Sequence, residues 1–278
     1  MMARRSIPLA ALLLLATFGS AVGRSSGINA LLSGFSGKLR AVFALPGESP
    51  GVPSAPGVYR WLADTRHALS LVVLTPFSAK VNGRIGSYRM GNWPFERRAP
   101  RDPAYANPEG FIEVTPSNFG TRVSEHFTLG QFVTKGQEDV WPKYVALDRR
   151  LVDKLELTIE ELARRGHPVS GLFVMSGFRT PDYNGSAGDT SGRSAVSRHL
   201  YGDAADVYPD SNGRAWIDDL NRDGRRDLND ARVVAAAAEA VEARHPELVG
   251  GIGVYPGNGS HGPFVHIDAR GKRARWTG

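Results

Sequence analysis

Hydrophobic residues recur at helical spacing between residues 144 and 164. The aliphatic side chains there stand three or four positions apart, at Leu147, Leu151, Leu155, Ile159 and Leu162. This period places them on one face of an amphipathic helix. Gly166 and Pro168 follow directly and favour the end of the helix. The pattern therefore predicts a helix over residues 144–164 with one buried face.

Two more elements follow along the chain. Residues 172–175 form a short apolar run that predicts a buried strand, with residues 176–181 in the loop at its carboxyl end. An alanine-rich segment over residues 230–244, closed by Pro246, predicts a second helix. Because helices precede and follow short strands, residues 121–278 are expected to form an α+β domain with a small mixed or antiparallel sheet and flanking helices.

Residues 24–120 have a different pattern. They are rich in Gly and Pro, and they contain short β-like runs at residues 68–74 and 111–115. Such runs, punctuated by Gly and Pro, predict a small β-rich module entered through a linker. We find no catalytic motif in this part and expect an accessory role for it.

The first 23 residues resemble a secretory signal peptide. Arg4 and Arg5 precede an apolar run over residues 7–18, and small residues follow at 19–23. An apolar run of about 12 residues is shorter than the ~20 needed to cross a bilayer as a helix. We therefore expect export with cleavage and no stable membrane insertion afterwards.

Composition narrows the chemistry. The 278 residues include no cysteine, so disulfides and thiolate ligands are excluded. The 34 basic and 28 acidic side chains give a net charge of +6, which favours anionic polymers. Nucleic acid is not an expected partner, because no recognition motif accompanies the charge and the chain is expected to be exported.

Two stretches supply candidate metal ligands. Residues 197–206 read Ser-Arg-His-Leu-Tyr-Gly-Asp-Ala-Ala-Asp, and residues 264–268 read Phe-Val-His-Ile-Asp. Two imidazoles and a carboxylate are the ligand set of a catalytic zinc, which keeps a further position open for water or substrate. His199 and Asp206 are seven positions apart, a spacing that fits a loop running into a strand. The small residues Gly202 and Ala204 are expected to let the backbone pass close to the ion.

The order of several separated motifs resembles that of a known family. Ser-x-His-x-x-Gly-x-Ala-x-Asp is preceded by Ser-Gly-Phe-Arg-Thr-Pro and followed by Gly-Ile-Gly-Val-Tyr-Pro and Phe-Val-His-Ile-Asp. Over residues 123–276 this resembles the zinc D-Ala-D-Ala carboxypeptidase and murein endopeptidase family, of the lysostaphin and hedgehog metallopeptidase type. The resemblance implies His199, Asp206 and His266 as zinc ligands. It also implies that Arg179 holds a carbonyl or carboxylate of the peptide, which suits a forked guanidinium.

The resemblance implies an exported zinc peptidase that acts on the peptide stems of peptidoglycan, in the periplasm or at the cell wall. A zinc ion lowers the pKa of its bound water towards ~7 and polarises a carbonyl, which amide hydrolysis requires. Either removal of a terminal D-Ala or cleavage of a cross-link is compatible with the motifs. Ser197 and Tyr255 are further candidates for substrate binding. Ser197 is not expected to be a nucleophile, because it lacks a Gly-x-Ser-x-Gly context.

The sequence departs from the better-known members at one position. They have an acidic residue three positions before the last histidine, whereas this chain has Pro263. Asp268 is the preferred replacement, either as general base or as the acceptor that orients an imidazole. His261 is the second candidate for proton transfer. Two alternatives stay open: a wall-binding protein that has lost catalysis, and an iron site, since two histidines and a carboxylate also form the facial triad of non-haem oxygenases.

An Asp-rich segment predicts a second ion site. Oxygen ligands stand at positions 1, 3, 5, 9 and 12 of a 12-residue calcium-loop pattern, with Gly224 at position 6. The predicted calcium ligands are Asp219, Asn221, Asp223, Arg225 through its backbone carbonyl, Asp227 and Asp230. The pattern resembles a dockerin loop. We expect this calcium loop to form an insertion over about residues 215–232 and to brace the segment between Asp206 and His266.

Overall fold

The structure is a computed structural model that describes residues 12–18, 55–64, 67–186 and 193–278. The rest of the predicted signal peptide and most of the predicted linker lie outside these ranges. A five-stranded sheet carries the part of the chain with the candidate ligands, and its order is β13-β11-β12-β10-β9. Its strands are β9 Phe173–Ser176, β10 Ala204–Tyr208, β11 Gly251–Tyr255, β12 Phe264–Asp268 and β13 Ala274–Thr277. Neighbouring strands are antiparallel except β11 and β13.

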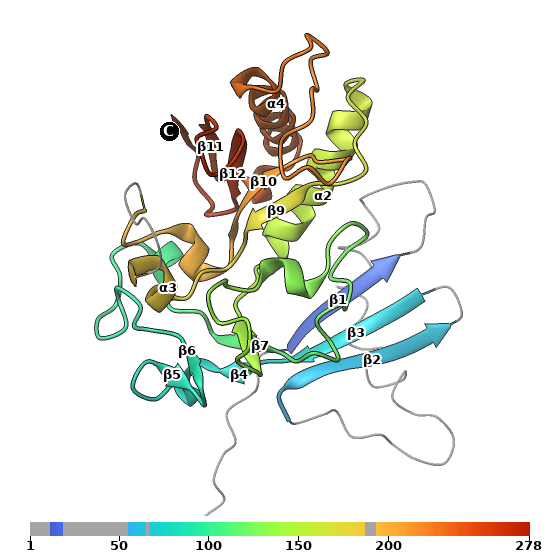
Figure 1. Ribbon diagram of the computed structural model, residues 1–278. Helices are drawn as coiled ribbons and strands as arrows, with labels where there is room; N and C mark the ends of the chain where they lie inside the picture. Colours follow the sequence, from blue (N-terminus) through green and yellow to red (C-terminus); the bar gives the residue numbers. More distant parts are fainter. Residues whose placement is uncertain (1–11, 19–54, 65–66, 187–192) are drawn as a thin grey trace, which may run out of the picture.

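Two helices cover one face of this sheet. They are α2, Arg149–Arg164, and α4, Leu228–Arg244, which pack against each other and against β12 (Figure 1). Arg275 on β13 donates a hydrogen bond from Nε to Glu239 Oε1 on α4, at 2.6 Å. The face of the sheet from which the Arg275 side chain projects is therefore the face covered by the helices. Ile252 and Ile267 share that side and are buried. The alternate residues of the same strands therefore project from the opposite face.

Both predicted helices are confirmed, with different starting points. The helix predicted over residues 144–164 begins only at Arg149, because Lys143–Val145 forms strand β8 against β7. Asp148 ends this extended stretch and caps α2, since its carboxylate accepts a hydrogen bond from the Arg150 amide at 2.8 Å. Helix α4 begins two residues before the predicted Asp230, with Asp227 as its cap. The strand predicted at residues 172–175 is present as β9, but it is not the buried strand that was expected: it stands at the edge of the sheet, and Phe173 is exposed.

The described residues before 121 contribute strands to small sheets. One sheet has the order β1-β3-β2 and another β4-β7-β8, while β5 pairs with β6. Their bounds are β1 Leu12–Phe18, β2 Gly57–Asp64, β3 His67–Val73, β4 Thr75–Pro76, β5 Arg84–Ile85, β6 Tyr88–Arg89 and β7 Gly110–Val114. The short helices are η1 Phe77–Ala79, η2 Pro103–Tyr105, η3 Leu129–Phe132, α3 Pro181–Ser186, η4 Arg198–Tyr201 and η5 Pro246–Leu248.

The core runs across the predicted boundary at residue 120. Strand β7 precedes that boundary, and it pairs with β8, which follows it. Phe111, Phe132 and Phe178 are fully or almost fully buried in one continuous hydrophobic cluster. Trp93 also donates a hydrogen bond from its indole Nε1 to the carbonyl of Leu200, at 2.8 Å. The early residues are thus packed into the same core as the candidate ligands.

The fold is mixed α+β, with small, mainly antiparallel sheets and few helices, which confirms the predicted class. Within the described ranges, no helix combines the length and the apolar character needed to traverse a membrane.

Candidate metal centre

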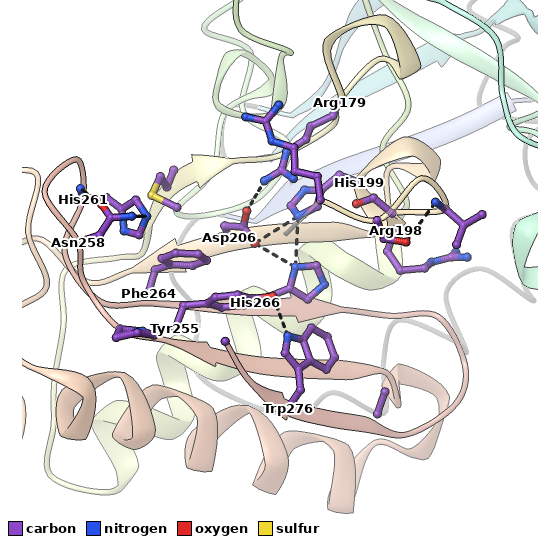
Figure 2. Close-up of a pocket in the computed structure, with 18 of the residues that line it drawn as sticks. Arg179, Arg198, His199, Asp206, Tyr255, Asn258, His261, Phe264, His266 and Trp276 are labelled. Atoms are coloured by element: carbon purple, nitrogen blue, oxygen red, sulfur yellow. Dashed lines mark hydrogen bonds and ion pairs between the residues drawn. The ribbon is translucent and has the colours of Figure 1, made fainter. Parts of the chain in front are cut away.

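Three side chains meet on the open face of the five-stranded sheet. His199 comes from η4, Asp206 from β10 and His266 from β12, and all three are buried (Figure 2). His199 Nε2 lies 3.2 Å from His266 Nδ1 and 3.2 Å from Asp206 Oδ1, and the third edge, His266 Nδ1 to Asp206 Oδ1, is 3.0 Å. Ligands bound tetrahedrally at about 2.0 to 2.1 Å are about 3.3 to 3.4 Å apart. The triangle is therefore nearly the right size, and the group could hold a metal ion.

Strand register explains why two of these residues meet. Asp206 and His266 are direct cross-strand partners in the β10–β12 pair, so both side chains leave the sheet on the same face. His199 reaches them from η4, which ends at Gly202 with a left-handed φ of +75° before β10 begins. The predicted strand is present as β10, but His199 stands on the short helix η4 rather than in the predicted loop.

The reason for Gly202 differs from the expected one. A Cβ at this position would lie 2.3 Å from the carbonyl oxygen of Ala146. The glycine thus permits a close approach between η4 and the segment before α2, in addition to its left-handed turn. The close contact is with a protein backbone rather than with the ion site.

Each histidine is oriented by a second hydrogen bond. His199 Nδ1 lies 2.6 Å from the carbonyl oxygen of Gly177, which can only accept, so Nδ1 carries the proton and Nε2 faces the centre. His266 Nε2 lies 3.1 Å from Asp268 Oδ2, so Nδ1 faces the centre. Metal-binding histidines commonly donate their other N–H to a carbonyl or carboxylate in this way. The two rings are preset to present one nitrogen each.

Burial and charge set the protonation of the group. Burial lowers the pKa of His199 to about 4, so this imidazole is neutral at neutral pH. Burial alone would raise the pKa of Asp206, but His199, Arg179 and His266 outweigh it and hold the pKa well below its usual range. For His266, burial is outweighed by the carboxylates on either side, Asp206 and Asp268, which raise its pKa. The group thus contains one ionised carboxylate and one neutral imidazole at neutral pH.

Arg179 lies beside this group. Its Nη2 donates to Asp206 Oδ2 at 2.5 Å, and its Nε donates to Ser176 Oγ at 2.8 Å. The side chain also lines the adjoining cleft. The residue predicted to hold substrate thus also fixes the carboxylate of a candidate ligand.

Asp268 fits the second of its two predicted roles, that of the acceptor that orients an imidazole. It is fully buried and is not among the residues that line the cleft. Its oxygens accept from His266, from the amide of Gly251 at 2.8 Å and from the Arg270 guanidinium. Burial alone would raise its pKa, but the hydrogen bonds from His266 and Arg270 hold the pKa far below its usual range.

A cleft of about 880 Å³ opens over the three side chains. The residues predicted for substrate binding and proton transfer line this cleft, apart from Asp268. They are Arg179, Ser197, Tyr255 and His261. Four arginines contribute to its walls: Arg179, Arg193, Arg198 and Arg270. Among the described residues of the lining, Asp206 is the one with a side-chain carboxylate. The cleft is therefore rich in cationic groups.

His261 lies towards one end of the cleft and away from the candidate ligands. It belongs to the connection between β11 and β12, and Figure 2 shows Phe264 between it and His266. Its Nδ1 lies 2.9 Å from the Gly262 carbonyl and its Nε2 lies 2.9 Å from Asn258 Nδ2. Both ring nitrogens are thus engaged within their own loop.

Sequence reasoning missed Trp276 and Tyr105, which also line the cleft. The Trp276 ring lies 5.2 Å from the His266 ring, and its Nε1 donates to the Tyr255 hydroxyl at 2.7 Å. Gly253 leaves room for it, because a Cβ there would fall 2.3 Å from the indole. The Gly-Ile-Gly run at residues 251–253 was a signal of such close packing. Tyr105 comes from η2, outside the stretch that carries the motifs.

The Asp-rich segment forms an ordered turn before α4. Asp219 accepts from the amides of Asp223 and Gly224, and the Gly224 φ of +82° gives the sharp turn expected at position 6. Asp227 caps the helix, and the fully buried Asp230 accepts from three backbone amides.

The remaining predicted calcium ligands take part in the same turn. Asn221 Oδ1 accepts from the Asp223 amide at 3.0 Å, and Asp223 Oδ1 accepts from the Arg225 amide at 2.8 Å. In the described part of the chain, His199, Asp206 and His266 form the one group of three or more His, Cys, Asp or Glu side chains gathered closely enough for a metal. Calcium binding by the turn stays a prediction.

Comparisons of the chain with protein-family models, with curated proteins and with solved structures gave no match.

Proposed function

We propose that this protein is an exported zinc-dependent peptidase that hydrolyses D-amino-acid-containing peptide bonds of peptidoglycan. The observation that carries the proposal is the convergence of His199 Nε2, Asp206 Oδ1 and His266 Nδ1 beneath a cleft. The motif order described above supports the family and the substrate class. The fold would then be of the D-Ala-D-Ala metallopeptidase type.

The donor set suits zinc. Two imidazole nitrogens and one carboxylate oxygen leave a further coordination position for water or substrate. Zinc in such a site lowers the pKa of bound water and polarises the scissile carbonyl. The same donors also accept iron, so the identity of the metal is part of the proposal.

Other residues of the chain orient the three candidate ligands. Gly177 and Asp268 fix the two imidazoles through their outer nitrogens, and Arg179 fixes the outer oxygen of Asp206. Arg179 also lines the cleft, so its guanidinium is placed to contact a bound peptide. A guanidinium there would attract a peptide carboxylate or carbonyl.

The direct test is digestion of cross-linked muropeptides by the purified protein lacking residues 1–23. We expect products that disappear with a chelator, return with zinc, and are absent in His199→Ala. Release of D-Ala identifies a carboxypeptidase, and conversion of dimers to monomers identifies an endopeptidase. Metal analysis of the same samples distinguishes zinc from iron. Chelator-resistant products, or no product, would refute a metallopeptidase.

A wall-binding protein without catalysis is the second candidate. It is favoured by the cleft lining, where Asp206 has the one side-chain carboxylate among the described residues and belongs to the metal group. No other lining side chain in that part of the chain supplies a carboxylate for proton transfer. Co-sedimentation with intact peptidoglycan, without chelator-sensitive cleavage, would support this candidate over the peptidase.

A further inference from the structure

The connection between β11 and β12 forms one end of the cleft. We call residues 256–263 the β11–β12 wall. Residues 256–260 are all exposed, and five residues of the wall line the cleft: Pro256, Gly257, Asn258, Ser260 and His261. The wall folds on itself, because the Asn258 amide donates to the His261 carbonyl at 2.8 Å and the Asn258 side chain accepts from the amides of Ser260 and His261. These bonds shape the turn but do not attach it to the rest of the protein.

A tryptophan from elsewhere in the chain packs on the base of this wall. A Cβ on Gly262 would lie 2.7 Å from Trp216 Cδ2 and 3.0 Å from Cε2 and Cγ. The indole therefore lies directly against the Gly262 backbone, with no space for a side chain between them. Gly262 and Pro263 are buried, although the neighbouring stretch 256–260 is exposed.

Trp216 is itself held in place. It lies in the connection between β10 and α4, and its Nε1 donates to the Arg226 carbonyl at 3.3 Å. Ile217, the next residue, is fully buried and anchors this connection in the core. On the other side, Asp210 accepts from the amides of Arg214 and Ala215. The tryptophan is thus presented by an anchored segment and not by a loose one.

Trp216 does not line the cleft, so it can act on substrate only through the wall. We propose that Trp216 is a positioning residue that fixes the β11–β12 wall and thereby sets the affinity of the cleft for its substrate. Asn258, Ser260 and His261 of the wall line the cleft. Their placement affects substrate binding, while the three candidate metal ligands stand on β10, β12 and η4. The part of this inference that concerns substrate rests on the proposed function.

Hydrogen exchange tests the positioning role without any assumption about activity. We expect Trp216→Ala to accelerate exchange of the amides of Asn258, Ser260 and His261 at least tenfold, because local opening becomes easier. Amides of β10 and β12 should keep wild-type exchange and show that the fold is intact. Trp216→Phe keeps a ring on Gly262 but lacks the indole N–H, so it should remain close to wild type. Wild-type protection of the wall in Trp216→Ala would overturn the inference.

Gly262→Ala provides a matched double-mutant cycle. Gly262 does not have a positive φ, so alanine suits its backbone, and the three atoms nearest to the added Cβ all belong to Trp216. Gly262→Ala should loosen the wall by itself but add little in the Trp216→Ala background, where the indole is gone. Additive effects of the two substitutions would mean that the contact does not carry the positioning.

Kinetics connect the wall to substrate. On muropeptide substrate, Trp216→Ala and Gly262→Ala should raise KM about tenfold or more with kcat within about twofold of wild type, and Trp216→Phe should preserve both. A fall in kcat at unchanged KM would overturn the role in substrate affinity. Failure of the proposed function gives a different result: wild type would show no turnover, while the exchange difference in the wall would persist.

Discussion

Arg179 and Asp206 form an ion pair in which the guanidinium holds the carboxylate oxygen that faces away from the two histidines. The Nη2–Oδ2 distance is 2.5 Å, while Oδ1 of the same carboxylate faces His199 and His266. A single carboxylate is thus shared between an arginine and a candidate metal position. This arrangement gives Arg179 a function even before any substrate arrives.

Replacement of Arg179 separates its two possible roles. If it fixes Asp206, Arg179→Ala should weaken zinc binding about tenfold or more, as loss of an outer partner of a metal ligand commonly does. If it contacts only substrate, zinc affinity should stay at the wild-type value while KM rises. Titration of zinc against a competing chelator, followed by steady-state kinetics, distinguishes these outcomes. Arg179→Lys, which keeps the charge but not the forked geometry, is the matched variant.

Asp268→Asn should lower zinc affinity about 10- to 100-fold without abolishing it. The carboxylate orients His266 through Nε2 and is itself fully buried. An amide cannot reproduce a carboxylate that accepts from both an imidazole and a guanidinium. Competition titration measures the effect, with the exposed Asp139→Asn as control. Unchanged zinc affinity in Asp268→Asn would contradict the orienting role.

Glu161 should contribute to stability in a pH-dependent manner. Its fully buried carboxylate receives hydrogen bonds from Arg164, Arg165 and Arg244. The hydrogen bond from Arg164 is the largest cause of a pKa far below the usual range, and those from Arg165 and Arg244 add to it despite burial. A lowered pKa stabilises the fold above the unfolded value of about 4.3, and this stabilisation is lost as the pH falls below that value.

Glu161→Gln is therefore expected to cost about 1 to 3 kcal/mol at neutral pH. This is less than for a fully buried ion pair, because the three arginines are partly exposed. The difference from wild type should be constant above about pH 5 and should shrink at lower pH. Urea unfolding at several pH values measures it, and a difference that grows in acid would contradict the sign.

Gly202→Ala should destabilise the protein more than Gly271→Ala. Both glycines have left-handed φ angles, +75° and +85°. A Cβ on Gly202 meets the Ala146 carbonyl at 2.3 Å, whereas a Cβ on Gly271 meets nothing within 4 Å. Gly271→Ala thus reports the backbone cost alone, about 1 kcal/mol, and the excess in Gly202→Ala reports the close approach. Equal losses in thermal unfolding would mean that the approach at Ala146 relaxes freely.

The Asp-rich turn yields a calcium prediction. If residues 219–230 bind calcium, the Tm of the wild type should rise by about 5 to 10 °C at a concentration near 100 times Kd. Asp223→Ala should remove that rise and leave zinc binding intact, while Asp139→Ala should keep it. A wild-type Tm that is the same with calcium and with a chelator would reject the calcium site.

The sequence was informative where a side chain's type and spacing decide its place. The helical period of Leu151, Leu155 and Leu162 predicted α2 and its buried face, and all three side chains are buried in that helix. The start of α2 was not predictable in the same way, because β8 forms only when β7 arrives from a distant part of the chain. Leu147 continues the helical period into a stretch that lies outside the helix.

In the candidate site too, local spacing predicted some features, whereas contacts between distant parts of the chain determine others. The spacing of His199 and Asp206 suggested a loop running into a strand; the strand is present as β10, whereas His199 stands on the short helix η4. The carbonyl that orients His199 lies far away in sequence, so no local pattern could reveal it. The hydrogen bond between His199 and the Gly177 carbonyl spans 22 residues. The contact between Trp216 and Gly262 likewise joins two loops with no shared motif.

The hydrogen bond from Trp93 to the carbonyl of Leu200 joins the early part of the chain to the neighbour of a candidate ligand. Together with the pairing of β7 and β8, this hydrogen bond means that residue 120 does not separate two independently packed units. A fragment beginning at residue 121 would lack the partner strand of β8 and the indole beside η4. We therefore expect exchange of residues 67–120 for an unrelated module to disturb the ion site itself, so these residues are best transplanted together with residues 121–278.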